Sequence, residues 1–160
     1  MRTFANMQRR QFVRLGSGFS MAGLAGLWPL GARAQAAPGW NKAAFDARTL
    51  AEVVKALGGS GPAAESRDIR LDAPEIAENG GIVRMAAQSA LAGTTQLALV
   101  VAKNPHPLAA VFEIPSGTDA GMTTNLKMAE TSNVYALARV GNQYFYAVRE
   151  VKVTLGGCGT

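Results

Sequence analysis

The stretch Gln96-Leu97-Ala98-Leu99-Val100-Val101-Ala102-Lys103 places six consecutive apolar residues between two polar ends. Successive side chains of a strand point to opposite faces, so this run is apolar on both faces and predicts a strand in the middle of a sheet. The next residues, Asn104-Pro105-His106-Pro107, end the strand because proline has no N–H to donate to a strand ladder. We therefore expect the core of the fold around residues 96–103.

Shorter extended segments lie on both sides of this run. Apolar and charged residues alternate over 69–72, and a turn at 78–81 precedes a strand that begins at Ile82. Further strands are predicted at 108–114, 124–129, 134–140, 144–148 and 151–155. Gly141-Asn142 is typical of a tight hairpin. This spacing predicts an antiparallel β-sandwich of the immunoglobulin-like type, with a closed barrel as the alternative.

One helix is predicted in front of the strands, from Lys42 to Leu57, with Asn41 as its N-cap. Apolar side chains recur at the helical spacing of three and four residues and form one stripe, made of Leu50, Val53, Val54 and Leu57. Gly58-Gly59 ends the helix. The fold class expected is therefore all-β with one N-terminal helix packed on a sheet.

Residues 1–34 have the pattern of a targeting peptide. Arg9 and Arg10 open a basic stretch, an apolar run extends over 15–30, and Ala32-Arg33-Ala34 fits a signal peptidase site. The apolar run is glycine-interrupted and shorter than the ~20 residues of a transmembrane helix. We predict export to the periplasm by the twin-arginine pathway, cleavage before Gln35, and no membrane attachment afterwards.

The net charge of the chain comes from this peptide. The chain has 16 Lys and Arg residues against 11 Asp and Glu, a net charge of +5. The five basic residues of the peptide are Arg2, Arg9, Arg10, Arg14 and Arg33. Without them, 11 basic residues balance 11 acidic ones, so the basic excess is no reason to expect nucleic-acid binding.

The chain has a single cysteine, Cys158, in the segment Gly156-Gly157-Cys158-Gly159-Thr160. Residues 35–155 are predicted to form the folded domain and 156–160 a flexible C-terminal arm, because glycine offers no side chain for packing. A lone thiol in an oxidising compartment has no internal disulfide partner. Thiolates form disulfides, persulfides and S-sulfonates reversibly. We interpret Cys158 as the covalent attachment point of a carrier that is not itself an enzyme.

Two other classes compete with this interpretation. A thiol-dependent enzyme, such as a sulfurtransferase or peroxidase, needs a base beside Cys158, yet the only histidine, His106, lies in the Pro-flanked loop. A copper electron carrier normally needs two histidines. No haem, iron–sulfur or phosphate-loop motif occurs, so no cofactor or metal is expected. Folded export without a cofactor instead favours a partner subunit. Tyr135, Tyr144, Phe145 and Tyr146 are most simply sheet residues, some of them in the core, and part of their surface is a candidate for the partner interface.

Several segments carry a resemblance to a known family. They are the export signal, Pro74–Gly80, Asn104–Leu108, Thr131–Val134 and the terminal Gly-Gly-Cys-Gly. Taken together, these segments resemble SoxY, the sulfur-carrier subunit of bacterial thiosulfate-oxidising systems. The resemblance implies an immunoglobulin-like sandwich in a heterodimer with a SoxZ-like subunit, and sulfur intermediates held covalently on Cys158. It also implies three enzymes as partners: a haem-containing conjugating enzyme, a sulfate-releasing hydrolase and a sulfane dehydrogenase. Thr160 departs from the family, whose arm commonly ends in two glycines.

Overall fold

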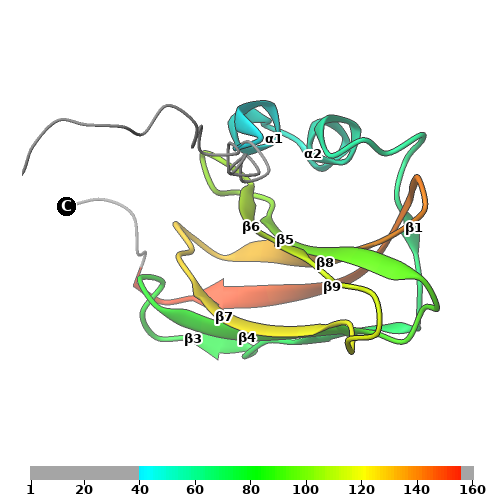
Figure 1. The fold of residues 1–160 in the computed structure, drawn as a ribbon. Coiled ribbons are helices and arrows are strands. Elements are labelled where there is room, and N and C mark those ends of the chain that lie inside the picture. The colour runs from blue at the N-terminus through cyan, green and yellow to red at the C-terminus, as the bar shows by residue number, and fades with distance from the viewer. Residues whose placement is uncertain (1–39, 156–160) are drawn as a thin grey trace, which may run out of the picture. The chain divides into compact units, whose positions relative to one another are not determined.

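The computed structural model describes residues 40–155, which form two β-sheets packed face to face with two short helices on one outer face (Figure 1). The large sheet has the order β1 (Ala64–Glu65), β9 (Gln143–Val153), β8 (Ser132–Val140), β5 (Thr94–Val101), β6 (Leu108–Glu113), and β3 (Ile76–Ala77) also pairs with β9. The small sheet has the order β2 (Ile69–Asp72), β4 (Val83–Ser89), β7 (Gly121–Leu126). The predicted immunoglobulin-like sandwich is confirmed, and two separate sheets replace the alternative of a closed barrel.

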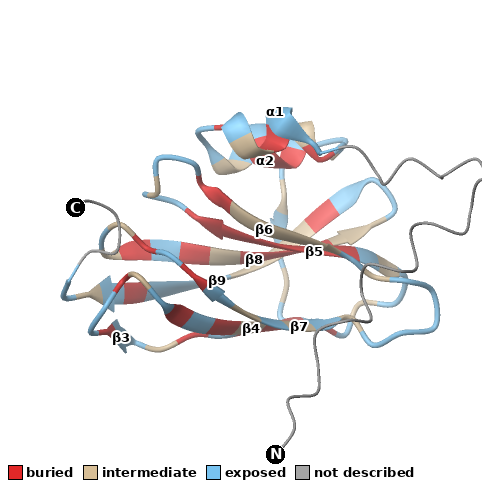
Figure 2. Cartoon of the chain, turned by 60° about the vertical axis from the view of Figure 1, so that its left-hand side comes forward, coloured by how far each residue is buried: buried red, intermediate tan, exposed pale blue. Residues whose placement is uncertain are grey.

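Strand β5 lies between β8 and β6 and is buried on both faces (Figure 2). Leu97, Leu99 and Val101 belong to the core between the sheets, whereas Ala98 and Val100 belong to a second core under the helices. All five side chains are 0% exposed. The prediction of a central strand here is confirmed, although the strand begins two residues earlier than expected.

The helical region differs from the prediction of one helix over 42–57. Two helices form, α1 (Lys42–Asp46) and α2 (Leu50–Ala56). Thr49 begins the second helix, because its Oγ1 accepts a hydrogen bond from the Glu52 amide at 3.2 Å, and the Glu52 carboxylate accepts one from the Arg48 amide at 2.7 Å. These two bonds satisfy amides at the start of α2, so α2 begins as a separate helix after α1 has ended at Asp46. The predicted N-cap at Asn41 is confirmed, since its side chain accepts from the Ala44 amide at 3.1 Å.

Helix α2 is fastened to the large sheet through Tyr144. Val53 and Val54, from the predicted apolar stripe, are buried in the same cluster as Tyr144. The Tyr144 hydroxyl donates to Gln96 Oε1 at 2.6 Å and lies 3.2 Å from the carbonyl oxygen of Leu57, the C-cap of α2. Burial raises the pKa of Tyr144, because the charged phenolate would lose its hydration there.

Two predicted strand boundaries are wrong. The strands predicted at 144–148 and 151–155 form one continuous strand, β9, because Arg149 and Glu150 pair with β8 and do not form a loop between strands; β9 ends at Val153, two residues before the predicted end. The segment predicted at 124–129 is strand β7, which begins earlier, at Gly121, and ends at Leu126. Met128, beyond its end, is 0% exposed and packs into the core between the sheets.

The sandwich is not wholly antiparallel. Strands β1 and β3 both run parallel to β9 along the same edge, with Ala64 opposite Phe145 and Ala77 opposite Val153. The chain leaves this edge after β1, crosses to the small sheet as β2, and returns as β3. Each of these edge strands has two residues, too few for an alternating pattern in the sequence. No helix within residues 40–155 is long and apolar enough to span a membrane.

Candidate functional site

The predicted attachment residue Cys158 and the arm residues Gly156, Gly157 and Gly159 lie outside the described residues. The predicted signal residues Arg9 and Arg10 lie outside them as well. The structure does describe the segment that leads into the arm, which is the end of β9 and the two residues after it, Thr154 and Leu155. We call this segment and its hydrogen-bonding partners the arm base.

The arm base is held along one side by residues of the Pro74–Gly80 segment. The Thr154 amide donates to the Ala77 carbonyl oxygen at 3.1 Å, and its hydroxyl donates to the Glu78 carbonyl oxygen at 2.9 Å. The Gly80 amide donates to the Leu155 carbonyl oxygen at 2.7 Å. Hydrogen bonds to the chain therefore continue beyond the end of β9 to the last residue before Gly156.

Thr131 holds the same segment through another side chain. Its hydroxyl accepts a hydrogen bond from the Val153 amide at 3.0 Å. Because Thr131 begins the Thr131–Val134 segment, two of the segments that carry the family resemblance meet at the arm base. Neither segment lies near the arm in the sequence.

The third segment, Asn104–Leu108, reaches the arm base through a buried methionine. The Asn104 side chain donates to the Lys127 carbonyl oxygen at 2.7 Å and accepts from the Ala129 amide at 2.9 Å, so it brackets Met128. The Met128 amide in turn donates to the Gly80 carbonyl oxygen at 2.7 Å. A continuous set of contacts thus runs from Asn104 through Met128 and Gly80 to Leu155. These residues, which lie far apart in the sequence, together hold the arm base in place.

The turn between β3 and β4 is fixed by its own side chain. Asn79 Oδ1 accepts a hydrogen bond from the Gly81 amide at 2.7 Å, which is the local geometry that asparagine favours in turns. The turn therefore presents both the amide and the carbonyl of Gly80 to their partners in a defined orientation.

His106 is not brought to the arm base. Its Nδ1 lies 3.1 Å from the carbonyl oxygen of Phe45 in α1, and the Arg48 side chain donates to the carbonyl oxygen of Pro105. The 104–107 loop thus contacts the arm base through Asn104 and the helices through His106. Within residues 40–155, no group of three or more His, Cys, Asp or Glu side chains is placed to hold a metal ion.

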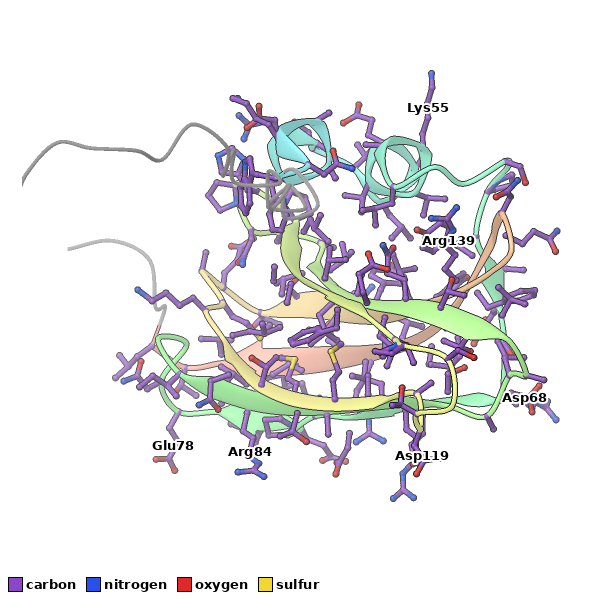
Figure 3. All side chains as sticks on the ribbon, viewed as in Figure 1. Lys55, Asp68, Glu78, Arg84, Asp119 and Arg139 are labelled. Carbon is purple, nitrogen blue, oxygen red and sulfur yellow. The ribbon has the colours of Figure 1, made fainter. Side chains whose placement is uncertain are left out.

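A groove of about 500 Å³ lies beside the arm base, along β3 and the adjoining end of β4. Its apolar lining includes Pro74, Ile76 and Ile82, and the two isoleucines are 60% and 73% exposed. Glu78 and Arg84 also line it, and Figure 3 shows both side chains projecting away from the interior of the sandwich. The ion pairs of the described residues, Lys42–Asp46 and Lys103–Glu130, involve neither of them.

The aromatic residues predicted as a possible partner surface have different surroundings. Tyr144 is 1% exposed and belongs to the core under the helices, so it cannot face a partner. Phe145 packs against the core between the sheets. Tyr135 and Tyr146 are half-buried and meet edge to face, with ring centroids 5.5 Å apart.

Sequence reasoning missed the groove and the hydrogen bonds that fasten the arm base. The turn at 78–81 was correctly predicted, and Asn79-Gly80-Gly81 is a sufficient signal for it. Its partner was missed because the bonds to Thr154 and Leu155 join residues far apart in the chain, and no local pattern specifies such pairing.

Comparison with known proteins bears directly on this arrangement. The family model of the sulfur oxidation protein SoxY matches residues 54–158, a range that includes the arm base and Cys158. The structure of the sulfur carrier protein SoxY from Chlorobium limicola f thiosulfatophilum is 34% identical and covers 65% of this chain and 94% of that chain, with a TM-score of 0.59. No curated protein matches the chain.

A lytic polysaccharide monooxygenase from Jonesia denitrificans has 17% identity, covers 59% of this chain and 60% of that chain, and has a TM-score of 0.35, which is too low to support any inference. The SoxY match, in contrast, extends over residues 54–158 of a chain of 160. It includes all three segments that converge on the arm base. The chain therefore belongs to the SoxY family of sulfur oxidation proteins.

Proposed function

We propose that this protein is a periplasmic sulfur carrier that holds thiosulfate-derived intermediates covalently on Cys158 and presents them to partner enzymes. One observation carries the proposal: the SoxY family match extends through Cys158, the only cysteine of the chain. The arm base supports it, because a carrier arm needs a fixed origin, and Thr154 and Leu155 are hydrogen-bonded to the Glu78–Gly80 turn.

Loading of the carrier is an oxidation. The Cys158 thiol and thiosulfate join through a new S–S bond, giving Cys–S–S–SO₃⁻, one proton and two electrons. The electrons pass to the haem of a separate conjugating enzyme. The role of this chain is to supply the sulfur nucleophile on an arm that enters the active site of that enzyme.

Unloading begins with hydrolysis. Water attacks the terminal sulfur of Cys–S–S–SO₃⁻, the bond between the two outer sulfur atoms breaks, and sulfate, a proton and the persulfide Cys–S–SH result. A hydrolase performs this step, and a sulfane dehydrogenase oxidises the remaining outer sulfur. The carrier has no catalytic activity of its own in this scheme, because all activation comes from the enzymes that receive the arm.

The proposal includes a heterodimer with a SoxZ-like subunit and export by the twin-arginine pathway. Replacing Arg9 and Arg10 by Lys is expected to abolish periplasmic accumulation while expression continues. Size-exclusion chromatography is expected to show co-elution with the SoxZ-like subunit. Normal export of the double variant, or separate elution of the two chains, would contradict the respective part of the proposal.

The decisive experiment is intact-mass spectrometry of the protein purified from thiosulfate-grown cells without reductant. The expected spectrum shows added masses of an S–SO₃ group or of sulfur atoms, all removed by a thiol reductant. Cys158→Ser is expected to show none of them, while its circular dichroism and thermal unfolding match those of the parent. Adducts that persist in Cys158→Ser, or an unmodified parent from actively oxidising cells, would refute the carrier function.

A further inference from the structure

We propose that the groove beside β3 is the docking site for the enzyme that joins thiosulfate to Cys158. The occupant we infer is the rim of that enzyme's active-site channel, with an apolar side chain inserted beside Ile76 and Ile82. The inference rests on the proposed carrier function and adds to it the surface on which the enzyme is recognised.

The short distance along the chain from Leu155 to Cys158 limits how far from the domain an enzyme can hold the thiol. Cys158 is three residues beyond Leu155, and three extended residues span only about 10 Å. Leu155 is hydrogen-bonded to Gly80, so this reach is measured from a fixed point on the domain. An enzyme that encloses the Cys158 sulfur must therefore bring its surface within about 10 Å of Leu155.

The groove falls inside the area that such an enzyme would cover. A typical protein–protein contact buries roughly 800 Å² on each partner, which corresponds to a disc of about 16 Å radius. Glu78 and Asn79 line the groove, and their neighbour Gly80 is bonded to Leu155. A contact centred on the arm base therefore includes the groove.

The composition of the groove fits a recognition surface. Ile76 and Ile82 are among the five large hydrophobic side chains that are exposed in the described residues, and a third, Leu155, is 70% exposed at the arm base itself. Asp72, Glu78 and Arg84 also line the groove and add charges of both signs. An apolar centre with charged neighbours is the usual anatomy of a protein interface.

The other two exposed hydrophobic residues provide a contrast. Trp40 stacks on Phe45, with ring centroids 4.2 Å apart and an interplanar angle of 13°, so a contact within the chain accounts for it. Val148 is 39% exposed on β9, opposite Tyr135 of β8. Trp40 precedes the N-cap of α1, and α1 lies on the opposite side of the large sheet from β3 and β4 (Figure 1), so Trp40 provides a matched control.

The test uses the carrier with its SoxZ-like subunit, the purified haem-containing conjugating enzyme and thiosulfate. The double variant Ile76→Ser/Ile82→Ser removes the apolar centre, and Trp40→Ser removes an equally exposed hydrophobic group elsewhere. The rate of adduct formation on Cys158 is followed by intact mass. We expect kcat/KM to fall about tenfold or more in the double variant, mainly through KM, and to stay unchanged in Trp40→Ser. Alkylation of Cys158 by iodoacetamide should be equal in all three proteins.

Four outcomes would overturn the docking site. The first is that kcat/KM of the double variant stays within about twofold of the parent value. The second is that kcat/KM falls equally in Trp40→Ser. Faster alkylation of Cys158 in the double variant without enzyme would mean that the arm itself occupies the groove. Loss of co-elution with the SoxZ-like subunit would mean that the groove is the subunit contact. Failure of the parent to load in this assay would instead count against the carrier function.

Discussion

The Gly80 amide and the Leu155 carbonyl oxygen lie 2.7 Å apart and join the turn after β3 to the last residue before the glycines of the arm. The next residue inward, Thr154, is bonded to the same turn through Glu78. Two consecutive residues outside the strand ladder are thereby kept in place. The position from which the arm starts is consequently a property of the folded domain, set by the turn at 78–81.

Replacing Thr154 by Val should loosen the arm base without unfolding the domain. The variant keeps the shape of the side chain but loses the hydrogen bond to Glu78, which is worth about 1 kcal/mol. Because that loss is local, we expect the Gly80 amide to exchange with solvent roughly fivefold faster, as measured by NMR hydrogen exchange.

The control for this experiment is Thr118→Val. Thr118 makes the same kind of bond, from its hydroxyl to the Pro115 carbonyl oxygen at 2.6 Å. Its neighbour Asp119 lies at the opposite end of the domain from Glu78 (Figure 3). Exchange at Gly80 should be unaffected by this change, and unchanged exchange in Thr154→Val would show that the Glu78 contact does not hold the arm base.

Replacing Tyr144 by Phe should lower the free energy of unfolding by about 1–3 kcal/mol, because the buried oxygen of Gln96 loses its donor. Urea unfolding measures the change. Tyr146→Phe is the matched control, since the described residues give its half-buried hydroxyl no hydrogen-bond partner, and its effect should be near zero. Equal unfolding midpoints for the two variants would contradict the role assigned to the Tyr144 hydroxyl.

Stability at alkaline pH should depend on the same residue. Burial raises the pKa of Tyr144 above its ordinary value of 10.0, so above that pH the unfolded chain releases this proton before the folded protein does. The free energy of unfolding should therefore fall as the pH rises above 10.0, and should fall less steeply in Tyr144→Phe. Parallel pH profiles for parent and variant would refute this coupling.

Gly59 should not tolerate a methyl group, whereas Gly61 should. A Cβ atom at Gly59 would lie 2.6 Å from Val54 Cγ1 and 2.9 Å from the Val54 carbonyl oxygen, where α2 meets Tyr144. At Gly61 nothing lies within 4 Å. We expect Gly59→Ala to cost about 1–3 kcal/mol in thermal or urea unfolding. Gly61→Ala should change stability by about 0.5 kcal/mol or less, and similar effects of the two changes would argue against close packing at Gly59.

The features that local sequence determines were the ones predicted best. The apolar composition of residues 96–103 predicts a buried strand. The residue types of Gly141-Asn142 predict a tight turn, and Gly141 has a φ of +60°. The break between the two helices has a local signal that the prediction of one helix did not use. Thr49-Leu50-Ala51-Glu52 is a capping-box sequence, which indicates the start of a helix. The predicted stripe is nevertheless real, since all four of its residues lie in α2 or at its C-cap, Leu57.

The convergence on the arm base was beyond local sequence reasoning. Ala77 pairs with Val153, and Asn104 brackets Met128, through contacts that only the folded topology creates. The family resemblance identified the segments concerned but not their proximity. Ile82 was predicted only to begin a strand, and Ile76 was noted only within the Pro74–Gly80 segment, because no local pattern shows that the two side chains are exposed in one groove.

Strand β9 is bonded along both edges, to β8 on one side and to β1 and β3 on the other, yet it is made after every other described strand. A nascent chain therefore cannot complete the large sheet until the ribosome has passed Val153. A copy that is cut short upstream of this point lacks both the strand that joins three others and the thiol that follows it. Misfolded, truncated copies would be open to proteolysis, so the supply of folded carrier is linked to chains that extend at least to the start of the arm.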